Sequence, residues 1–500
     1  MAACLAASLC ATPVWSQRAA SPGLPALGDG ADITLSAERQ LGDRIARELY
    51  RDPDYLEDPV LDEYLQSIWQ PLVQSAQARG EISPELQERF AWKILIGKDR
   101  SVNAFALPGG YLGVHLGLIS VVSSRDELAS VMAHELSHVT QRHISRSMGE
   151  QARMTPWLIG AMILGMLAAS KSTQGAQALI VGGQAMSAQS QLNFSRDMER
   201  EADRVGFGVM AQAGFEPQAF VSMFEKLQQA SRLNDSGGFP YLRSHPLTTE
   251  RMADMQARAG QAAPAGSAGA LDMEHALVAA RARVLSNASV DALRTWSLEV
   301  EPARMTRMPA IAQAASLYGA TLAAMKLRDF AAARSALAQL DKRTSGDVRA
   351  HRLARLLGAE LALAQSDALG ALAAMQAVSD NGRDTVLLRA AALTRTGQAT
   401  QAAQAAQSLQ TWLADHPRDA QAWQLLANAN AAQRRTLSAI RAEAEVNVVQ
   451  LDYGAALNRL QAVQDLARSG VNADEHIEAA IVDTRTRQVE SLVKEQALER

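Results

Sequence analysis

Apolar residues recur at helical spacing over most of the chain, and the clearest run lies shortly after residue 124. Five of them repeat with a period near that of an α-helix: Leu128, Val131, Met132, Leu136 and Val139. Ser124 and Glu127 precede this run with the spacing of a capping box, in which both side chains accept hydrogen bonds from first-turn amides. Because no Pro or Gly follows until Gly149, the pattern predicts a helix of about 20 residues that starts near Arg125.

Shorter patterns predict the elements before this helix. Residues 36–51 and 58–73 have helical spacing. The second of these places five apolar residues on its inward face: Leu61, Leu65, Ile68, Trp69 and Leu72. Residues 90–96, 102–107 and 111–119 favour strands, with a Pro-Gly-Gly turn between the last two. We therefore expect a small sheet directly before the long helix.

The C-terminal half is predicted to be helical throughout. Residues 259–270 are rich in Gly and Ala and indicate a linker, after which an Ala-rich helical pattern continues to the end of the sequence. Segments around Tyr318, Pro417 and Leu451 resemble helix–turn–helix tetratricopeptide units. Stacked units of this kind form concave surfaces that bind peptides or partner proteins. A plain array of helices without a repeat is the alternative.

Composition narrows the class of protein. The 500 residues are 48% hydrophobic and 20% charged, as in ordinary globular domains. This length is consistent with about two or three domains. A net charge of −4 without a block of like charges does not indicate a nucleic-acid partner. An aromatic content of 5% with abundant Ala argues against an all-β fold, so we expect a mainly α fold of the α+β kind.

Residues 1–16 are small and apolar and are typical of a secretory signal peptide. Small residues stand one and three positions before Gln17, as at a signal-peptidase site, although no basic residue precedes them. A short buried segment is the alternative. Residues 17–33 indicate a linker. Both cysteines, Cys4 and Cys10, lie in the leader, so the mature chain would have no thiol to ligate a metal or attack a substrate.

The long predicted helix carries a zinc-binding motif, His134-Glu135-Leu-Ser-His138. Residues four apart lie on the same face of a helix, so His134 and His138 can hold one zinc ion with Glu135 beside it. A surface helix with two solvated histidines is the alternative. In the apolar context of this helix, two unpaired buried imidazoles would be costly, and a bound cation would remove that cost.

A second, acidic segment supplies further candidates. Glu199 and Asp203 lie four residues apart and share a face of a predicted helix. We assign Glu199 as the third zinc ligand and Asp203 as the residue that hydrogen-bonds a ligating histidine. Taken alone, this segment would be a solvated acidic face. Three protein ligands leave one zinc position open to water, as in catalytic sites, with Glu135 as general base.

Two further histidines lie near these motifs. His245 follows a Gly-containing loop, from which it could reach the metal. There it would either stabilise the tetrahedral oxyanion or occupy the fourth coordination position and keep the enzyme latent; a surface histidine is the alternative. As a permanent fourth ligand it would make the zinc purely structural. His143 lies five residues after His138, about 140° round an ideal helix from the ligand face, so we leave it outside the site.

An uncharged run, Trp157–Ala169, lies between the two motifs. At 1.5 Å per residue it is too short to span a bilayer as a helix. It predicts either a buried helix or a hairpin that lies on a membrane surface or covers the active site.

Together these motifs resemble metallopeptidase family 48, a family of zinc peptidases. The resemblance rests on H-E-x-x-H followed by E-x-x-A-D, on Asn103-Ala-Phe-Ala-Leu-Pro-Gly-Gly110, and on Ser244-His245-Pro246 with Arg251. Only the short apolar run separates the first two motifs, which is similar to the soluble, secreted branch of the family. The resemblance implies a zincin-type protease domain over residues 34–258, one zinc ion, and a tetratricopeptide-like repeat domain over residues 271–500.

The resemblance also implies a location and partners. It implies the periplasm of a Gram-negative bacterium, with unfolded or misassembled outer-membrane proteins as substrates and the β-barrel assembly machinery as a partner of the repeats. We therefore expect a periplasmic zinc metalloendopeptidase that degrades misfolded or stalled outer-membrane proteins and assists their assembly. The competing function is a non-proteolytic scaffold or chaperone, in which the repeats bind the assembly machinery.

In zinc peptidases, a substrate often adds as a strand to the edge of a sheet, where main-chain hydrogen bonds hold it. We assign this substrate-binding role to Asn103, Ala104 and Phe105, on the strand that precedes the zinc helix. A plain core hairpin is the alternative.

Overall fold

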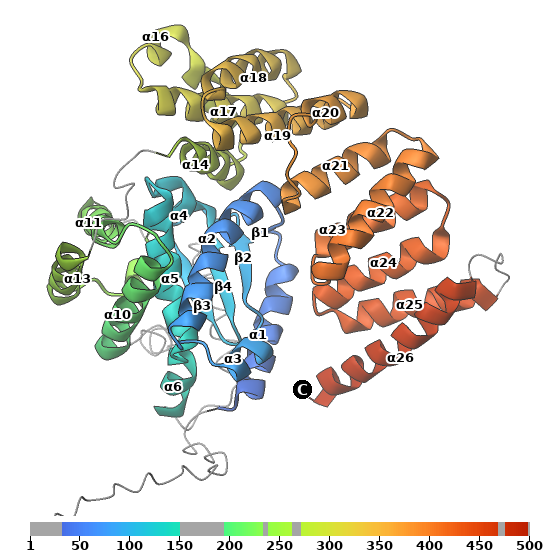
Figure 1. The fold of residues 1–500 in the computed structure, drawn as a ribbon, viewed down its shortest axis with the longest axis horizontal. Helices are drawn as coiled ribbons and strands as arrows, with labels where there is room; N and C mark the ends of the chain where they lie inside the picture. Colours follow the sequence, from blue (N-terminus) through green and yellow to red (C-terminus); the bar gives the residue numbers. More distant parts are fainter. Residues whose placement is uncertain (1–32, 151–194, 234–238, 263–271, 469–475, 499–500) are drawn as a thin grey trace, which may run out of the picture.

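The computed structural model describes residues 33–150, 195–233, 239–262, 272–468 and 476–498. Helices around a small sheet form the N-terminal part, and a long series of helix pairs follows it (Figure 1). This confirms the expected mainly α fold. The predicted leader, nearly all of the linker after it, and the apolar run Trp157–Ala169 lie outside the described residues. No helix within the ranges given is both long and apolar enough to cross a membrane.

A four-stranded sheet lies at the centre of the N-terminal part. Its strands are β1 (Tyr55–Leu56), β2 (Lys93–Gly97), β3 (Ala104–Leu107) and β4 (Tyr111–His115), in the order β1-β2-β4-β3. β2 runs parallel to β4, whereas β1 with β2 and β3 with β4 form antiparallel pairs. Leu107 lies opposite Tyr111, so the predicted turn closes a hairpin, and β3 is an edge strand of this sheet.

The third predicted strand is shorter than its apolar pattern indicated. β4 ends at His115, and Leu116–Val121 form helix α4. Leu116, Leu118 and Ile119 are all buried, as are the five residues of β4, so the apolar pattern alone did not show where the strand ends. At Gly117 an added Cβ would lie 2.1 Å from the carbonyl oxygen of Arg100, so only glycine permits the two backbones to approach this closely.

Helices cover both faces of the sheet. The further N-terminal helices are α1 (Leu35–Tyr50), α2 (Pro59–Ala78), α3 (Pro84–Arg89), α5 (Arg125–Thr140), α6 (His143–Glu150), α10 (Arg196–Gln212), α11 (Gln218–Leu233), α12 (Tyr241–Ser244) and α13 (Thr249–Gln261). Alternating residues of β2 separate the two layers, since Ile94 and Ile96 pack in the cluster that contains α2 and α5, whereas Leu95 packs with α1. All five residues predicted to face inward from α2 are buried.

The central helix, α5, begins as predicted and ends early. The Ser124 hydroxyl accepts a hydrogen bond from the Glu127 amide at 3.1 Å, and every residue from Glu127 to Thr140 is buried. The helix has 16 residues instead of about 20, because Arg142 adopts a left-handed backbone with φ of 52°. The Arg142 guanidinium lies 2.9 Å from the Glu38 carboxylate of α1. The sequence pattern around α5 does not indicate this contact.

The C-terminal part consists of helices packed in succession. They are α14 (Met273–Ser286), α15 (Val290–Ser297), α16 (Pro302–Met305), α17 (Ala310–Lys326), α18 (Phe330–Thr344), α19 (Val348–Ala364), α20 (Ala368–Ala374), α21 (Arg383–Arg395), α22 (Ala399–Asp415), α23 (Ala420–Ala432), α24 (Thr436–Val449), α25 (Tyr453–Arg468) and α26 (His476–Leu498), with a 3₁₀ turn at Leu298–Val300. Arg328, Ser366 and Leu451 share one turn geometry, with φ near +60°. Each is followed by an Asp whose carboxylate accepts a hydrogen bond from an amide of the next helix. This recurring turn supports the repeat interpretation.

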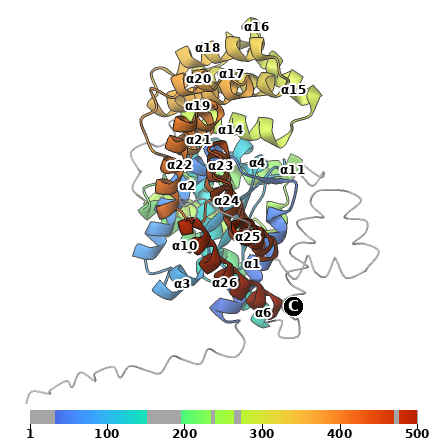
Figure 2. The same cartoon turned by 90° about the vertical axis from the view of Figure 1, so that its right-hand side faces the viewer.

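The helix pairs curve around the N-terminal part from α14 through α21 to α26 (Figure 1). Seen from the side, α22 to α26 lie in front of α1 and α2 (Figure 2). The buried Arg281 guanidinium of α14 lies 2.8 Å from the Asp58 carboxylate, which caps α2, and 2.7 Å from Glu360 of α19. Farther along, Arg51 lies 2.9 Å from Asp452. The repeats are thus held against the N-terminal part at widely separated points.

Candidate metal centre

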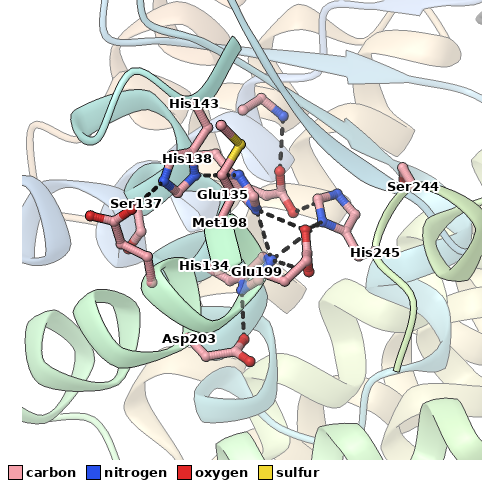
Figure 3. A network of polar contacts seen from close by, with 12 residues as sticks. His134, Glu135, Ser137, His138, His143, Met198, Glu199, Asp203, Ser244 and His245 are labelled. Carbon is pink, nitrogen blue, oxygen red and sulfur yellow. Dashed lines mark hydrogen bonds and ion pairs between the residues drawn. The ribbon is translucent and has the colours of Figure 1, made fainter. Parts of the chain in front are cut away.

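Four side chains from three segments converge on one point beside the sheet (Figure 3). His134 and His138 come from successive turns of α5, Glu199 from the start of α10, and His245 from the residue after α12. Their ligand atoms all lie within 4.8 Å of one another, and each residue is at most 2% exposed. The structure brings the three predicted ligands together and adds His245, the candidate for a fourth position.

The spacing of the four groups suits a tetrahedral zinc ion. Zinc lies about 2.0–2.2 Å from nitrogen and oxygen ligands, which separates neighbouring ligand atoms by about 3.3–3.6 Å. His134 Nε2 lies 3.0 Å from His138 Nε2 and 3.5 Å from Glu199 Oε2, and His138 Nε2 lies 3.4 Å from Glu199 Oε1. His245 Nδ1 lies 3.3 Å from His134 Nε2 and 2.9 Å from Glu199 Oε1. Imidazole and carboxylate are also the donors that zinc takes where no thiolate is present.

The two helix histidines differ in pKa because their surroundings differ. Burial alone would lower the pKa of His134, but its hydrogen bonds to Asp203 and Glu199 outweigh burial and raise the pKa to about 10. For His138 burial dominates, and its pKa falls well below the usual range. The pKa values of the two imidazoles therefore shift in opposite directions, although both side chains are buried.

A buried arginine holds the two acidic residues of α10. Asp203 Oδ1 lies 2.9 Å from His134 Nδ1, a distance that fits the predicted orienting role. The Arg251 guanidinium donates two hydrogen bonds to the Asp203 carboxylate, at 2.6 and 2.8 Å, and its Nη1 lies 2.6 Å from Glu199 Oε2. Burial alone would raise the pKa of Asp203, but the Arg251 and His134 hydrogen bonds hold this pKa below its usual value.

Close packing of α10 on α5 sets the distance between the two motifs. At Gly206 an added Cβ would lie 3.0 Å from the carbonyl oxygen of Ala133 and 3.1 Å from the His134 amide nitrogen. Because glycine has no Cβ, the two helix backbones can approach each other closely next to His134, a candidate ligand. Asp203 and Glu199, about one and two turns earlier on α10, therefore reach His134.

A second chain of contacts leads outward from His138. Its Nδ1 lies 2.9 Å from Nδ1 of His143, whose Nε2 lies 3.1 Å from Glu201 Oε2. Arg146 donates a hydrogen bond to the same Glu201 oxygen at 2.8 Å. Burial lowers the pKa of His143 to about 4, so its imidazole is neutral at physiological pH. The expectation that His143 lies outside the site assumed an unbroken helix; the left-handed Arg142 ends α5 and turns His143 back toward His138.

Glu135 is completely buried, and its two carboxylate oxygens face different surroundings. Its Oε2 accepts a hydrogen bond from the Ala106 amide at 2.9 Å. Its Oε1 has no hydrogen-bond partner in the part of the chain that the structure describes, and lies 3.5 Å from His245 Nε2. Burial raises the pKa of Glu135 above its usual value, although His245 and His134 act in the opposite direction. A carboxylate with a raised pKa and one unengaged oxygen is suited to accept a proton.

Tyr241 packs against the candidate fourth ligand. Its ring stacks on His245 at a centroid distance of 4.6 Å and an interplanar angle of 28°, and it also contacts His134 edge-on. The His245 amide donates a hydrogen bond to the Tyr241 carbonyl at 2.9 Å. The Tyr241 amide in turn lies 3.4 Å from the Val102 carbonyl, just before β3, so the segment that carries His245 is attached to the sheet.

The predicted substrate strand lies beside Glu135. The Asn103 carbonyl accepts a hydrogen bond from the His115 amide, so Asn103 and Phe105 direct their main-chain groups toward β4. Ala104 and Ala106 direct theirs to the other side, where the Ala106 amide meets Glu135. The Phe105 ring covers Gly113 on the face away from α5.

Several neighbours of the site had no role in the sequence-based prediction. Arg251 belonged to the motif that indicated the family, but nothing in the sequence paired it with Asp203. Tyr241 carried no local signal. Glu201 lies about 200° round α10 from Glu199, so helical spacing predicted that it points away from the metal position. That spacing did not indicate its contact with His143.

Comparisons with known proteins agree with this geometry. The model of Peptidase family M48 matches residues 59–259. The beta-barrel assembly-enhancing protease of Escherichia coli is 32% identical over 440 residues, which cover 87% of this chain and 86% of the relative. The protein of the same name from Yersinia pestis is 28% identical over 430 residues, covering 84% of this chain and 83% of the relative. A mitochondrial metalloendopeptidase of Saccharomyces cerevisiae is 26% identical over 196 residues, covering 38% of this chain and 54% of the relative.

The alignment with the E. coli protein covers most of both chains. The residues that match the family model include His134, His138, Glu199 and His245. The chain therefore belongs to peptidase family M48 and is a zinc-dependent metalloendopeptidase.

Proposed function

We propose that this chain is a periplasmic protease that cleaves misfolded or stalled outer-membrane β-barrel proteins and assists their assembly. The observation that carries the proposal is the convergence of His134, His138 and Glu199 beside the buried Glu135. The substrate class is supported by the names of the relatives that align over most of this chain. The location is supported by residues 1–16, which resemble a secretory leader. Residues 34–258 form the proposed protease domain, which the family match over 59–259 supports.

Each site residue has a proposed role. His134, His138 and Glu199 hold zinc, and Asp203 fixes the tautomer of His134. Bound zinc supplies Lewis acidity toward a water molecule and the scissile carbonyl. Glu135 takes a proton from that water on Oε1 and passes it to the leaving amine, while the Ala106 amide holds Oε2. His245 acts as a fourth ligand that must leave before a substrate is cleaved, a role that its distances to Glu199 and His134 support.

The proposed substrate position is the edge of β3 that pairs with no other strand in the described residues. The main-chain groups of Ala104 and the carbonyl of Ala106 point to that edge, so an extended peptide could pair with them, while the Ala106 amide stays with Glu135. Asn103 and Phe105 hold the strand on β4. The repeat domain, residues 271–500, is the proposed binding partner of the β-barrel assembly machinery. Its stacked helix pairs provide the extended surface that such contacts use.

The test combines zinc content with casein cleavage. Glu135→Gln should retain zinc and lose cleavage by at least about a hundredfold, because the proton acceptor is gone. Exposed Glu88→Gln is the matched control and should leave both unchanged. His245→Ala should cleave faster than the parent if His245 blocks the fourth position, whereas loss of the fold would indicate a purely structural zinc. Cleavage by the Glu135→Gln protein would refute the assignment of Glu135 as general base. Full rescue of a deletion strain by the Glu135→Gln protein would favour the scaffold function.

A further inference from the structure

His143 and Glu201 extend the metal centre beyond its ligands. His143 is buried at the start of α6 and touches His138, nitrogen to nitrogen, at 2.9 Å. Only one proton can lie between two imidazole nitrogens at this distance, so one ring donates and the other accepts. Which ring donates determines where His138 carries its proton.

The two arrangements have opposite consequences for zinc. If His138 donates from Nδ1, its Nε2 has a free lone pair, and this is the atom that faces Glu199 and His134. If His143 donates instead, Nδ1 of His138 is the acceptor, so the N–H of that ring lies on Nε2 and points into the metal position. Only the first arrangement lets His138 bind zinc through the nitrogen that faces the other ligands.

Glu201 distinguishes the two arrangements. When His143 accepts at Nδ1, its own proton lies on Nε2 and points at Glu201 Oε2, 3.1 Å away. In the opposite arrangement a lone pair of His143 would face a carboxylate oxygen at that distance, which is repulsive. Arg146 holds the same oxygen at 2.8 Å, so Glu201 stays in place as an acceptor. The carboxylate therefore favours the zinc-binding arrangement through an intervening ring.

We propose that His143 and Glu201 are positioning residues that hold His138 in its zinc-binding tautomer. The proposal rests on the proposed role of His138 as a ligand and adds a second support that parallels the one from Asp203 to His134 (Figure 3). Neither His143 nor Glu201 contacts the metal position itself, because neither belongs to the converging group of four. Their effect is on the affinity for zinc.

The test measures the zinc dissociation constant by competition with a chromogenic chelator, together with the melting temperature of the metal-free protein. His143→Leu, which can neither accept nor donate, should weaken zinc binding by about 10–100-fold. His143→Gln should bind zinc nearly as the parent does, since its amide oxygen can accept from His138 and its NH₂ can donate to Glu201. Glu201→Ala should also weaken binding, whereas Asp197→Ala, an exposed carboxylate on the same helix, should not.

Three outcomes would overturn the positioning role of His143 and Glu201. They are an unchanged zinc affinity in His143→Leu, equal losses of zinc affinity in His143→Leu and His143→Gln, or equal effects of Glu201→Ala and Asp197→Ala. The second would mean that packing, and not hydrogen bonding, is responsible. If His143→Leu does not fold, Glu201, whose side chain is 28% exposed, provides the same comparison. A parent without zinc affinity would refute the ligand assignment as well, whereas a zinc-binding parent with unaffected variants refutes the positioning role alone.

Discussion

Replacing Arg251 by Met tests the electrostatic design of the centre most directly. Met is unbranched, apolar and uncharged, so the substitution removes the cation and retains the part of the side chain nearest the backbone. Arg251 is 4% exposed and touches both Asp203 and Glu199, each 1% exposed. Two buried carboxylates would lose a shared cation, and breaking a buried pair in this way costs about 3–5 kcal/mol.

The expected change is large enough to measure by thermal unfolding in the presence of a chelator. For a domain the size of the N-terminal part, about 1 kcal/mol corresponds to about 2–4 °C, so Arg251→Met should lower the melting temperature by roughly 10 °C. Arg258→Met is the matched control, since Arg258 lies on the same helix and contacts Asp254 at 2.9 Å with both side chains about two-fifths exposed. An exposed pair contributes about 0–1 kcal/mol.

The pH dependence provides a second check. The pKa of Asp203 is held below its usual value, so its pairing with Arg251 stabilises the fold above the unfolded-state pKa, near 4, and this stabilisation is lost as pH falls through the lower native pKa. The stability difference between the parent and Arg251→Met should therefore be full at pH 7 and shrink below about pH 4. Equal melting temperatures for the Arg251 and Arg258 variants at pH 7 would refute the reasoning.

Two further predictions concern the same centre. Because the pKa of His134 without zinc is about 10, zinc binding at pH 7 should release about one proton. Calorimetry would show this release as a binding enthalpy that changes with the ionisation enthalpy of the buffer. A binding enthalpy that is the same in all buffers would contradict the prediction. Gly206→Ala should cost about 1 kcal/mol and weaken zinc binding, because its Cβ would press on Ala133, whereas Gly260→Ala, exposed with open space around it, should be neutral or slightly stabilising. Equal effects of the two glycine substitutions would show that α10 does not depend on this close approach.

Local pattern was sufficient where the chemistry lies within one element. The period of apolar residues and the Ser124 cap predicted the start of α5, and the four-residue spacing of His134 and His138 placed both imidazoles on one face. The same rule correctly placed Glu199 and Asp203 on one face of α10. Helical geometry is set by neighbouring residues, so the sequence contains it directly.

Tertiary contacts decided the features that the pattern predicted wrongly or omitted. α5 ends where Arg142 has a left-handed backbone and its guanidinium contacts Glu38 of another helix, and beyond this end His143 lies against His138. The strand expected over 111–119 became helix α4 after His115, where the backbone passes close to Arg100. Such contacts join residues that are distant in sequence, so the spacing of apolar residues within one element cannot predict them.

The sequence by itself indicated the candidate ligands His134, His138 and Glu199 and the helices that carry them. Only the folded structure decided how those helices meet: Gly206 sets the distance between α10 and α5, and Arg251 neutralises the acidic pair. The stacked Tyr241 fixes His245 beside the ligands. The physical reason is that spacing along a helix follows from backbone geometry, whereas convergence on one ion depends on packing and charge balance between segments far apart in the chain.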